Sequence, residues 1–250
     1  MIIKFLEWNL HAMGGVGYVI PSFIPEYVKE SDIFVLTEFR ISKGWDSFEA
    51  SLNSQYDLYC SPFMRVGYNQ ICIGIRKSLK LKVLSIKTLD SCNMKLPEFL
   101  QLDVSISNKL LSLIGVRIKT QGNCKTDQYK FLHDHIKEIE NVICLGDFNC
   151  DSSELNQKLE DVADVYGPRI VKGYFSFVFQ NGDALGLDWL ITKGVSSVYN
   201  GYADSDKSPY ATYDWSFITS HNGYDAKASN DFLGIKGLPD HAILKGMIEI

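Results

Sequence analysis

Short apolar runs dominate this sequence, and most of them have the length of a β-strand. In residues 98–107, every second residue from Leu100 to Ile106 is apolar, which is the period-2 pattern of a strand with one buried face. The segment NKL at 108–110 predicts a tight hairpin to the next strand. Further strands are predicted at 2–9, 31–39, 55–61, 66–76, 81–88, 110–119, 142–146, 171–180, 186–193, 212–218 and 242–249.

Helical periodicity is strong in residues 126–140. The apolar residues of this segment recur at i, i+3, i+7 and i+10 and form one face: Tyr129, Leu132, Ile136 and Ile139. Thr126 is a suitable N-cap for this helix. Shorter helices are predicted at 24–30 and from Ser152.

Strands outnumber helices in this pattern, and several strands are joined by hairpins. A fold of strictly alternating strands and helices is therefore disfavoured, and two packed sheets with helices on the outside are expected. The chain has no Pro/Gly/Ser-rich linker and no repeat, so we expect one domain over residues 1–250.

Composition narrows the function classes. The 250 residues are 46% hydrophobic and 22% charged, as in an ordinary globular protein, and no run approaches the length of a membrane span. The formal net charge of −5 argues against wrapping nucleic acid by bulk positive charge. It leaves a nucleic-acid substrate open, because bound metal ions can supply positive charge at a site.

The cysteines and the first residues bear on the compartment. Lys4 and Glu7 interrupt the first apolar run, which is untypical of a signal peptide. No CxxC motif occurs, so a zinc site is not expected. We therefore expect a cytoplasmic protein with reduced thiols. The six cysteines are Cys60, Cys72, Cys92, Cys124, Cys144 and Cys150.

Polar residues of the kind found in active sites recur at the ends of the apolar runs. They are Asn9, Glu38, Asp147, Asn149, Asp240 and His241. Asp147 and Asn149 are two residues apart, so continued strand geometry would point both side chains the same way. Each residue alone is more typical of a turn, where Asn and Asp bond to the local backbone.

Asp188 differs because it lies inside the apolar segment LGLDWLIT. A buried carboxylate needs a partner, and His241 is the obvious candidate. Such a pair would fix the orientation of the imidazole ring and favour its charged form.

The motifs WN, TE, GDFN, LDWL and PDH follow in this order, each beside an apolar strand, and end at Asn9, Glu38, Asn149, Leu190 and His241. Together they resemble the endonuclease/exonuclease/phosphatase superfamily. The segment VGYNQICIGIR is similar to the central glycine-containing strand of that family. The resemblance spans residues 5 to 246.

This resemblance implies a four-layer α/β sandwich, in which two packed mixed β-sheets are flanked by helices. It also implies an enzyme that cleaves phosphoester bonds with Mg²⁺ or Mn²⁺. The implied metal ligands are Asn9, Glu38 and Asp240. Asp147 would deprotonate the attacking water, and Asn149 would donate a hydrogen bond to the phosphate or the nucleophile. His241, supported by Asp188, would stabilise the transition state.

Arg117 departs from the family pattern, in which many members carry Tyr or His near this strand end. Arginine suits a phosphate clamp but is a poor proton donor, so protonation of the leaving group would rely on metal-bound water. Pro239 replaces the usual small polar residue before the final Asp–His, a change we expect to be tolerated.

The resulting hypothesis is a monomeric Mg²⁺-dependent phosphoric ester hydrolase acting on nucleic acid, a DNA or RNA nuclease. Two alternatives remain open: an enzyme acting on inositol phosphates or phospholipids, and a catalytically silent binding module of the same fold.

Overall fold

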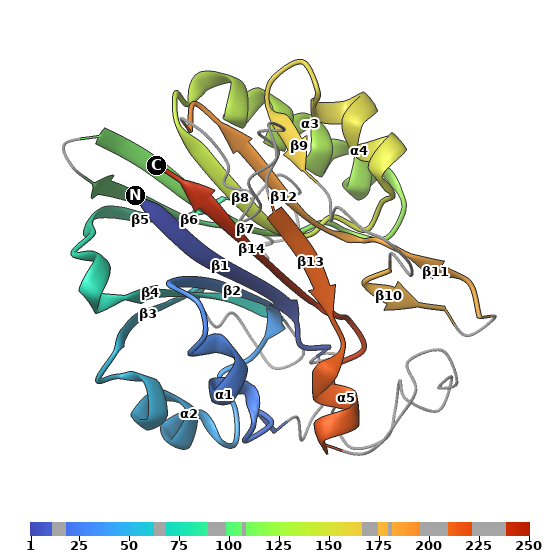
Figure 1. Ribbon diagram of the computed structural model, residues 1–250. Helices are drawn as coiled ribbons and strands as arrows, with labels where there is room; N and C mark the ends of the chain where they lie inside the picture. The colour runs from blue at the N-terminus through green and yellow to red at the C-terminus, as the bar shows by residue number, and fades with distance from the viewer. Residues whose placement is uncertain are drawn as a thin grey trace.

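Two β-sheets pack face to face and are covered by helices on both outer sides, which makes four layers (Figure 1). The computed structural model describes residues 1–11, 19–62, 69–89, 99–106, 109–166, 175–179, 182–195, 210–221 and 239–250. The architecture confirms the predicted four-layer α/β sandwich.

The first sheet has six strands in the order β13-β14-β1-β2-β4-β3. β1 and β2 are parallel, and the other neighbours are antiparallel. The strands are β1 (Ile2–Asn9), β2 (Ile33–Phe39), β3 (Tyr56–Cys60), β4 (Gln70–Arg76), β13 (Tyr210–Asp214) and β14 (Ile243–Glu249).

The second sheet also has six strands, in the order β5-β6-β7-β8-β12-β9. Here β7 and β8 are parallel and the remaining pairs are antiparallel. The strands are β5 (Lys82–Leu89), β6 (Phe99–Ile106), β7 (Lys109–Arg117), β8 (Val142–Asp147), β9 (Asp164–Tyr166) and β12 (Asp188–Lys193). A separate hairpin is formed by β10 (Phe177–Val178) and β11 (Ala184–Leu185).

The helices cover the outer faces. α1 (Ile24–Val28), α2 (Trp45–Leu52) and α5 (Ser216–His221) lie beside the first sheet, and α3 (Asn123–Glu138) and α4 (Ser152–Leu159) cover the second (Figure 1). A short 3₁₀ turn, η1 (Lys77–Leu79), follows β4. None of the helices in the described ranges is long and apolar enough to cross a membrane.

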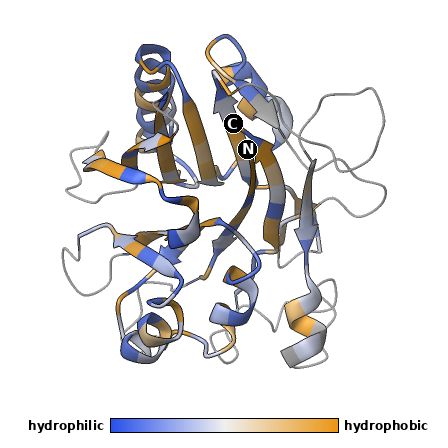
Figure 2. Cartoon of the chain, turned by 60° about the vertical axis from the view of Figure 1, so that its left-hand side comes forward, coloured by the Kyte–Doolittle hydropathy of each residue, from blue (hydrophilic) through white to orange (hydrophobic). Residues whose placement is uncertain are grey.

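Burial of apolar side chains explains the layers. Alternating residues of β6, such as Leu100 and Leu102, pack between the two sheets. The opposite faces pack against the helices, around Trp8 on one side and Leu132 on the other. The central strands are accordingly mostly hydrophobic in Figure 2, whereas the helices are mixed. Such burial contributes about 25 cal/mol per Å² of apolar surface.

Several local predictions were wrong. Helix α3 begins at Asn123 after Gly122, so Thr126 is not its N-cap. The strand predicted at 212–218 ends at Asp214 and is followed by helix α5. Helix α2 was not predicted. The strand predicted at 171–180 and the hairpin at 108–110 lie partly outside the described residues.

The cysteines also depart from expectation. Cys60, Cys72, Cys144 and Cys150 are free thiols, as expected. Cys124 is bonded in a disulfide, which contradicts the expectation that every thiol is reduced.

Candidate active site

The strand pairing brings the predicted residues to one end of the sandwich. In the second sheet, Asp147 at the end of β8 lies opposite Asp188 at the start of the antiparallel β12. Arg117 at the end of β7 lies beside Asp147 in the parallel pair β7–β8. In the first sheet, Asn9 ends β1 near the start of its antiparallel neighbour β14, which begins two residues after His241.

Asp188 and His241 form the predicted buried pair. The Nδ1 atom of His241 lies 2.7 Å from Oδ2 of Asp188, and both side chains are almost entirely buried. The indole nitrogen of Trp8 donates to the backbone carbonyl of His241 at 3.0 Å, which fixes the position of this residue. Burial lowers the pKa of His241. The charge and hydrogen bond of Asp188, together with the charges of Asp240 and Asp147, outweigh this effect, so the pKa is raised well above its usual value.

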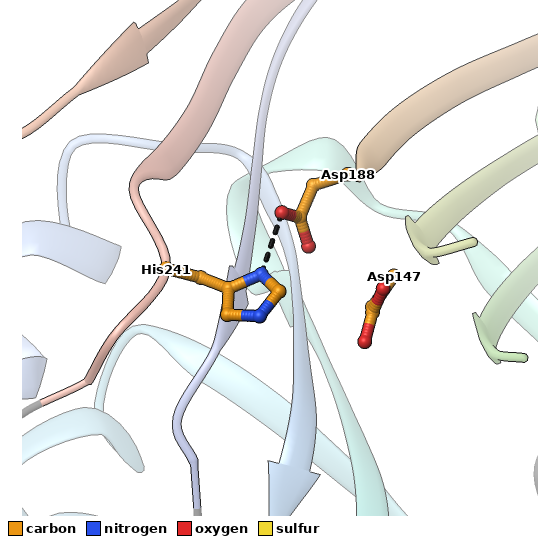
Figure 3. A group of neighbouring side chains, drawn as sticks. All are labelled: Asp147, Asp188 and His241. Carbon is orange, nitrogen blue, oxygen red and sulfur yellow. Dashed lines mark hydrogen bonds and ion pairs between the residues drawn. The ribbon is translucent and has the colours of Figure 1, made fainter. Parts of the chain in front are cut away.

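Asp147 faces this pair. One carboxylate oxygen from each aspartate and one ring nitrogen of His241 lie within 4.8 Å of one another (Figure 3). The Nε2 atom of His241 lies on the side of the ring away from Asp188 (Figure 3). Glu38 and Asp240 do not join this close group.

The Asp147 carboxylate is held by three hydrogen bonds. Oδ1 accepts from the backbone N–H of Asn149 at 2.9 Å. Oδ2 accepts from the side-chain amides of Asn9 at 3.0 Å and Asn149 at 2.9 Å. Burial raises the pKa of Asp147 to about 7. The charge of His241 lowers this pKa and the charge of Asp188 raises it, and both effects are smaller than that of burial. A carboxylate with such a pKa is suited to general-base work near neutral pH.

Asn149 meets Asp147 through a turn, because the strand ends at Asp147. Its backbone is left-handed, with φ of +50°, a conformation that Asn tolerates better than most residues. Its side-chain amide donates to the carbonyl of Ile118 at 2.7 Å as well as to Asp147. Both amide hydrogens are thereby engaged, so Asn149 positions Asp147 in this arrangement.

Glu38 is presented by an irregularity in β2. The register between β2 and β4 shifts between Leu36 and Phe39, and Glu38 has a left-handed φ of +45°. Such bulges re-aim a side chain at the end of a strand. Arg117 donates to Glu38 Oε1 from both Nε (3.0 Å) and Nη2 (2.7 Å).

Asp240 is paired with a residue that the motif analysis did not include. Its Oδ2 atom lies 2.9 Å from Nδ1 of His11, and His11 donates its backbone N–H to Asn9 Oδ1 at 2.9 Å. His11 also has a left-handed φ of +50°. The signal available in the sequence was only its position two residues after Asn9.

One of the predicted metal ligands has an unpaired oxygen of the kind that a hard divalent cation binds. Asp240 Oδ1 is buried and has no hydrogen-bond partner among the described residues. Glu38 and Asn9, the other two predicted ligands, also offer only oxygen atoms as metal donors. Mg²⁺ and Mn²⁺ prefer such ligands, and a buried unpaired carboxylate oxygen is costly without a partner.

Glu7 is a further acidic residue that the sequence reasoning missed. Its side chain is completely buried in β1, and Oε1 accepts from the Thr37 hydroxyl at 3.0 Å. Burial raises the pKa of Glu7 well above its usual value, and the charges of Asp188 and Asp147 raise it further. The signal was present: Glu7 shares the face of Ile3 and Phe5, which lies against the other sheet.

Comparison with known proteins identifies similar solved structures. No protein-family model and no curated protein matches the sequence. Truncated TDP2 from Caenorhabditis elegans matches 100% of this chain over 98% of its own, with a TM-score of 0.68 and 17% identity. An endonuclease/exonuclease/phosphatase from Bacteroides vulgatus matches 100% and 99% of the two chains, with a TM-score of 0.66 and 15% identity. D. rerio TDP2 complexed with single-strand DNA product matches 100% and 99%, with a TM-score of 0.62 and 13% identity.

Proposed function

Because the chain has the endonuclease/exonuclease/phosphatase fold, we propose that it is a divalent-metal-dependent phosphodiesterase that hydrolyses nucleic acid. The observation that carries the proposal is the close group of Asp147, Asp188 and His241 at the end of the sandwich. This group combines a general base of suitable pKa, Asp147, with a histidine that is paired with an aspartate. The predicted metal ligands near it offer oxygen atoms.

Asp147 is the general base in this proposal. It removes a proton from a water molecule, whose oxygen then attacks phosphorus while the bond to the leaving oxygen breaks. Asn149 and Asn9 hold the carboxylate in the required orientation through the hydrogen bonds described above. A base that is already oriented needs little reorganisation when the reaction occurs.

His241 offsets the negative charge that develops on the phosphoryl oxygens. Asp188 occupies Nδ1, so Nε2–H is available to donate to a phosphoryl oxygen. Preorganised charged donors of this kind are worth about 2.7–4 kcal/mol in the transition state. Two separate aspartates are needed, because the partner of a charged histidine cannot also accept the proton of the water.

Glu38, Asp240 and Asn9 would hold Mg²⁺ or Mn²⁺, which supplies charge neutralisation at the phosphate when bound. Arg117 orients Glu38 through Oε1 and lies next to Asp147 in the sheet, where its guanidinium can also contact a phosphate. With a net charge of −5, positive charge for an anionic substrate must be local to this site.

Nucleic acid is the proposed substrate for two reasons. First, one of the similar structures is D. rerio TDP2 in complex with single-strand DNA product, so DNA is a reasonable substrate to test here. In addition, the hairpin β10–β11 places Phe177 beside His241, with ring centroids 4.9 Å apart, and Phe179 packs on Phe177. Aromatic rings near a phosphodiester site can stack on bases.

The test uses labelled single-stranded and duplex DNA, RNA, inositol phosphates, sphingomyelin and a generic aryl phosphodiester, with Mg²⁺ or Mn²⁺ and with EDTA. We expect cleavage of a nucleic acid that EDTA abolishes. His241→Ala should be inactive, whereas His133→Ala, on the surface helix α3, serves as the matched control. Turnover of inositol phosphates or phospholipid alone, or no turnover of any substrate, would refute the proposal.

A further inference from the structure

The turn after strand β8 is held in place by side chains from other elements. The backbone carbonyl oxygens of residues 148–150 each accept a hydrogen bond from a different side chain. The donors, in that order, are the Tyr129 hydroxyl (2.5 Å), the Lys125 ammonium (2.9 Å) and the Trp189 indole N–H (2.9 Å). The turn that follows Asp147 therefore cannot rearrange without breaking bonds to α3 or β12.

Lys125 is the donor of this group that can be changed without opening the core. Tyr129 and Trp189 belong to the apolar cluster between α3 and the second sheet, so replacing either one would also disturb packing. Lys125 lies in the first turn of α3 and reaches across to the β8 turn. Its effect on the turn can therefore be measured separately from the packing of the core.

The Asn149 carbonyl is a group whose direction matters for the site. Asn149 has a left-handed φ of +50°, and a non-glycine residue keeps such a conformation only where its surroundings determine it. Its backbone N–H donates to Asp147 Oδ1 at 2.9 Å, and its side-chain amide donates to the Ile118 carbonyl at 2.7 Å. Because ψ of Asn149 sets the direction of its carbonyl, the Lys125 ammonium stabilises this one conformation.

We propose that Lys125 is a positioning residue of the active site. By binding the Asn149 carbonyl, its ammonium keeps Asn149 in the conformation that directs the N–H and the side-chain amide of Asn149 to Asp147. This role requires no contact between Lys125 and the substrate. The catalytic consequence rests on the proposed function, whereas the effect of Lys125 on the turn does not.

A simpler explanation is that Lys125 only joins α3 to α4. Its Nζ atom lies 3.2 Å from Oε2 of Glu154, in the first turn of α4. The Glu154 side chain is 37% exposed, and ion pairs at such sites contribute little. Glu154 also has a second lysine, Lys158, at 3.8 Å. The two explanations differ in what they predict for Glu154→Gln, which removes the charge of the ion pair and leaves the carbonyl bond intact.

Kinetics on the best phosphodiester substrate measure the catalytic consequence. Lys125→Met keeps most of the apolar stem and removes the donor, so we expect kcat to fall about tenfold or more with KM nearly unchanged. Lys125→Arg keeps a charged N–H donor and should recover most of that loss. Glu154→Gln should stay within about threefold of the wild type. Lys130→Met, which breaks an exposed ion pair with Asp134 on the same helix, is the matched control.

Amide hydrogen exchange, followed by nuclear magnetic resonance, tests the turn without any substrate. The Asn149 N–H should exchange about tenfold or more faster in Lys125→Met, and at nearly the wild-type rate in Lys125→Arg and Lys130→Met. The N–H of Ile143, inside β8, should keep its rate in all variants, because only the turn loosens. If the protein cleaves no phosphodiester, the proposed function fails while exchange at Asn149 still decides whether Lys125 holds the turn.

Three results would overturn the inference. The first is an unchanged exchange rate of the Asn149 N–H in Lys125→Met. The second is exchange at Ile143 that accelerates as much as exchange at Asn149, which would indicate general loosening. The third, on an active enzyme, is a kcat of Lys125→Met within about threefold of the wild type, or an equal loss in Glu154→Gln. If Lys125→Met does not fold, Lys125→Gln, whose side chain is shorter, is judged by the same criteria.

Discussion

Replacing Asp188 by Asn tests the centre of the proposed mechanism. The change keeps the size of the side chain and removes the negative charge that faces His241 Nδ1 at 2.7 Å. A hydrogen bond between charged groups contributes about 1.5–3 kcal/mol, and each 1.4 kcal/mol corresponds to a factor of ten. If His241 acts as a charged donor, kcat should therefore fall about 10- to 100-fold.

The same substitution should alter stability in a pH-dependent way. The pKa of His241 is raised in the folded protein, so the pair stabilises the fold fully below the usual histidine pKa of about 6.5. That contribution is lost as the pH rises through the raised pKa. The difference in unfolding free energy between the wild type and Asp188→Asn should thus be largest in mild acid and shrink in alkaline solution.

The assay combines initial rates on the best phosphodiester substrate with urea unfolding followed by circular dichroism, both between about pH 5.5 and 9. Asp183→Asn, an exposed aspartate in the β10–β11 hairpin, is the control for the loss of one negative charge. The reasoning is refuted if folded Asp188→Asn retains kcat within about threefold of the wild type, because the pair would then contribute less than 1 kcal/mol.

Four further predictions concern separate parts of the molecule. The kcat/KM value should fall tenfold per pH unit below about pH 7, because Asp147 must be deprotonated and burial raises its pKa to about 7; a flat acid limb contradicts its role as base. Glu38→Gln should raise the Mg²⁺ concentration for half-maximal activity about tenfold or more, measured by metal titration after chelation; an unchanged requirement removes Glu38 from the metal site. Phe179→Ala should raise KM for oligonucleotides about fivefold or more without lowering kcat; an unchanged KM excludes stacking there. Gly74→Ala should cost about 1–3 kcal/mol in thermal unfolding, because its Cβ would lie 2.1 Å from the ring of Phe34; an unchanged midpoint would show that the core adapts.

Most of the strands could be predicted from the sequence because burial sets their pattern directly. β6 alternates because one face meets the other sheet, and β2 is apolar from Ile33 to Leu36 because both of its faces are covered. The order of motifs also pointed to the endonuclease/exonuclease/phosphatase fold, which the similar solved structures confirm. The start of α3 was missed because Gly122 and the residues after it look like a loop until tertiary contacts form.

The pairing of the site residues was only partly predictable. The Asp188–His241 pair followed from the cost of burying an unpaired carboxylate among apolar residues. The pairing of His11 with Asp240 did not, because it depends on the antiparallel contact between β1 and β14, which brings residues far apart in sequence together. Asn149 reaches Asp147 by a turn, the local structure that is typical of Asn and Asp at strand ends, and not by continued strand geometry.

The burial of Glu7 illustrates a different limit. Along the sequence it interrupts an apolar run, an arrangement that also occurs at strand edges and in loops. Only the packing of the two sheets shows that its side chain is completely buried within β1. A polar residue in register with core residues is the signal that could have identified it.

The backbone at the rim of the site has a consequence for how this protein can change. His11, Glu38 and Asn149 adopt left-handed conformations that glycine would accept more easily. Substitution by glycine at any of these positions should therefore relax the backbone, but it would also remove the side chain that the site uses. Stability and chemistry therefore favour different residues at these three positions.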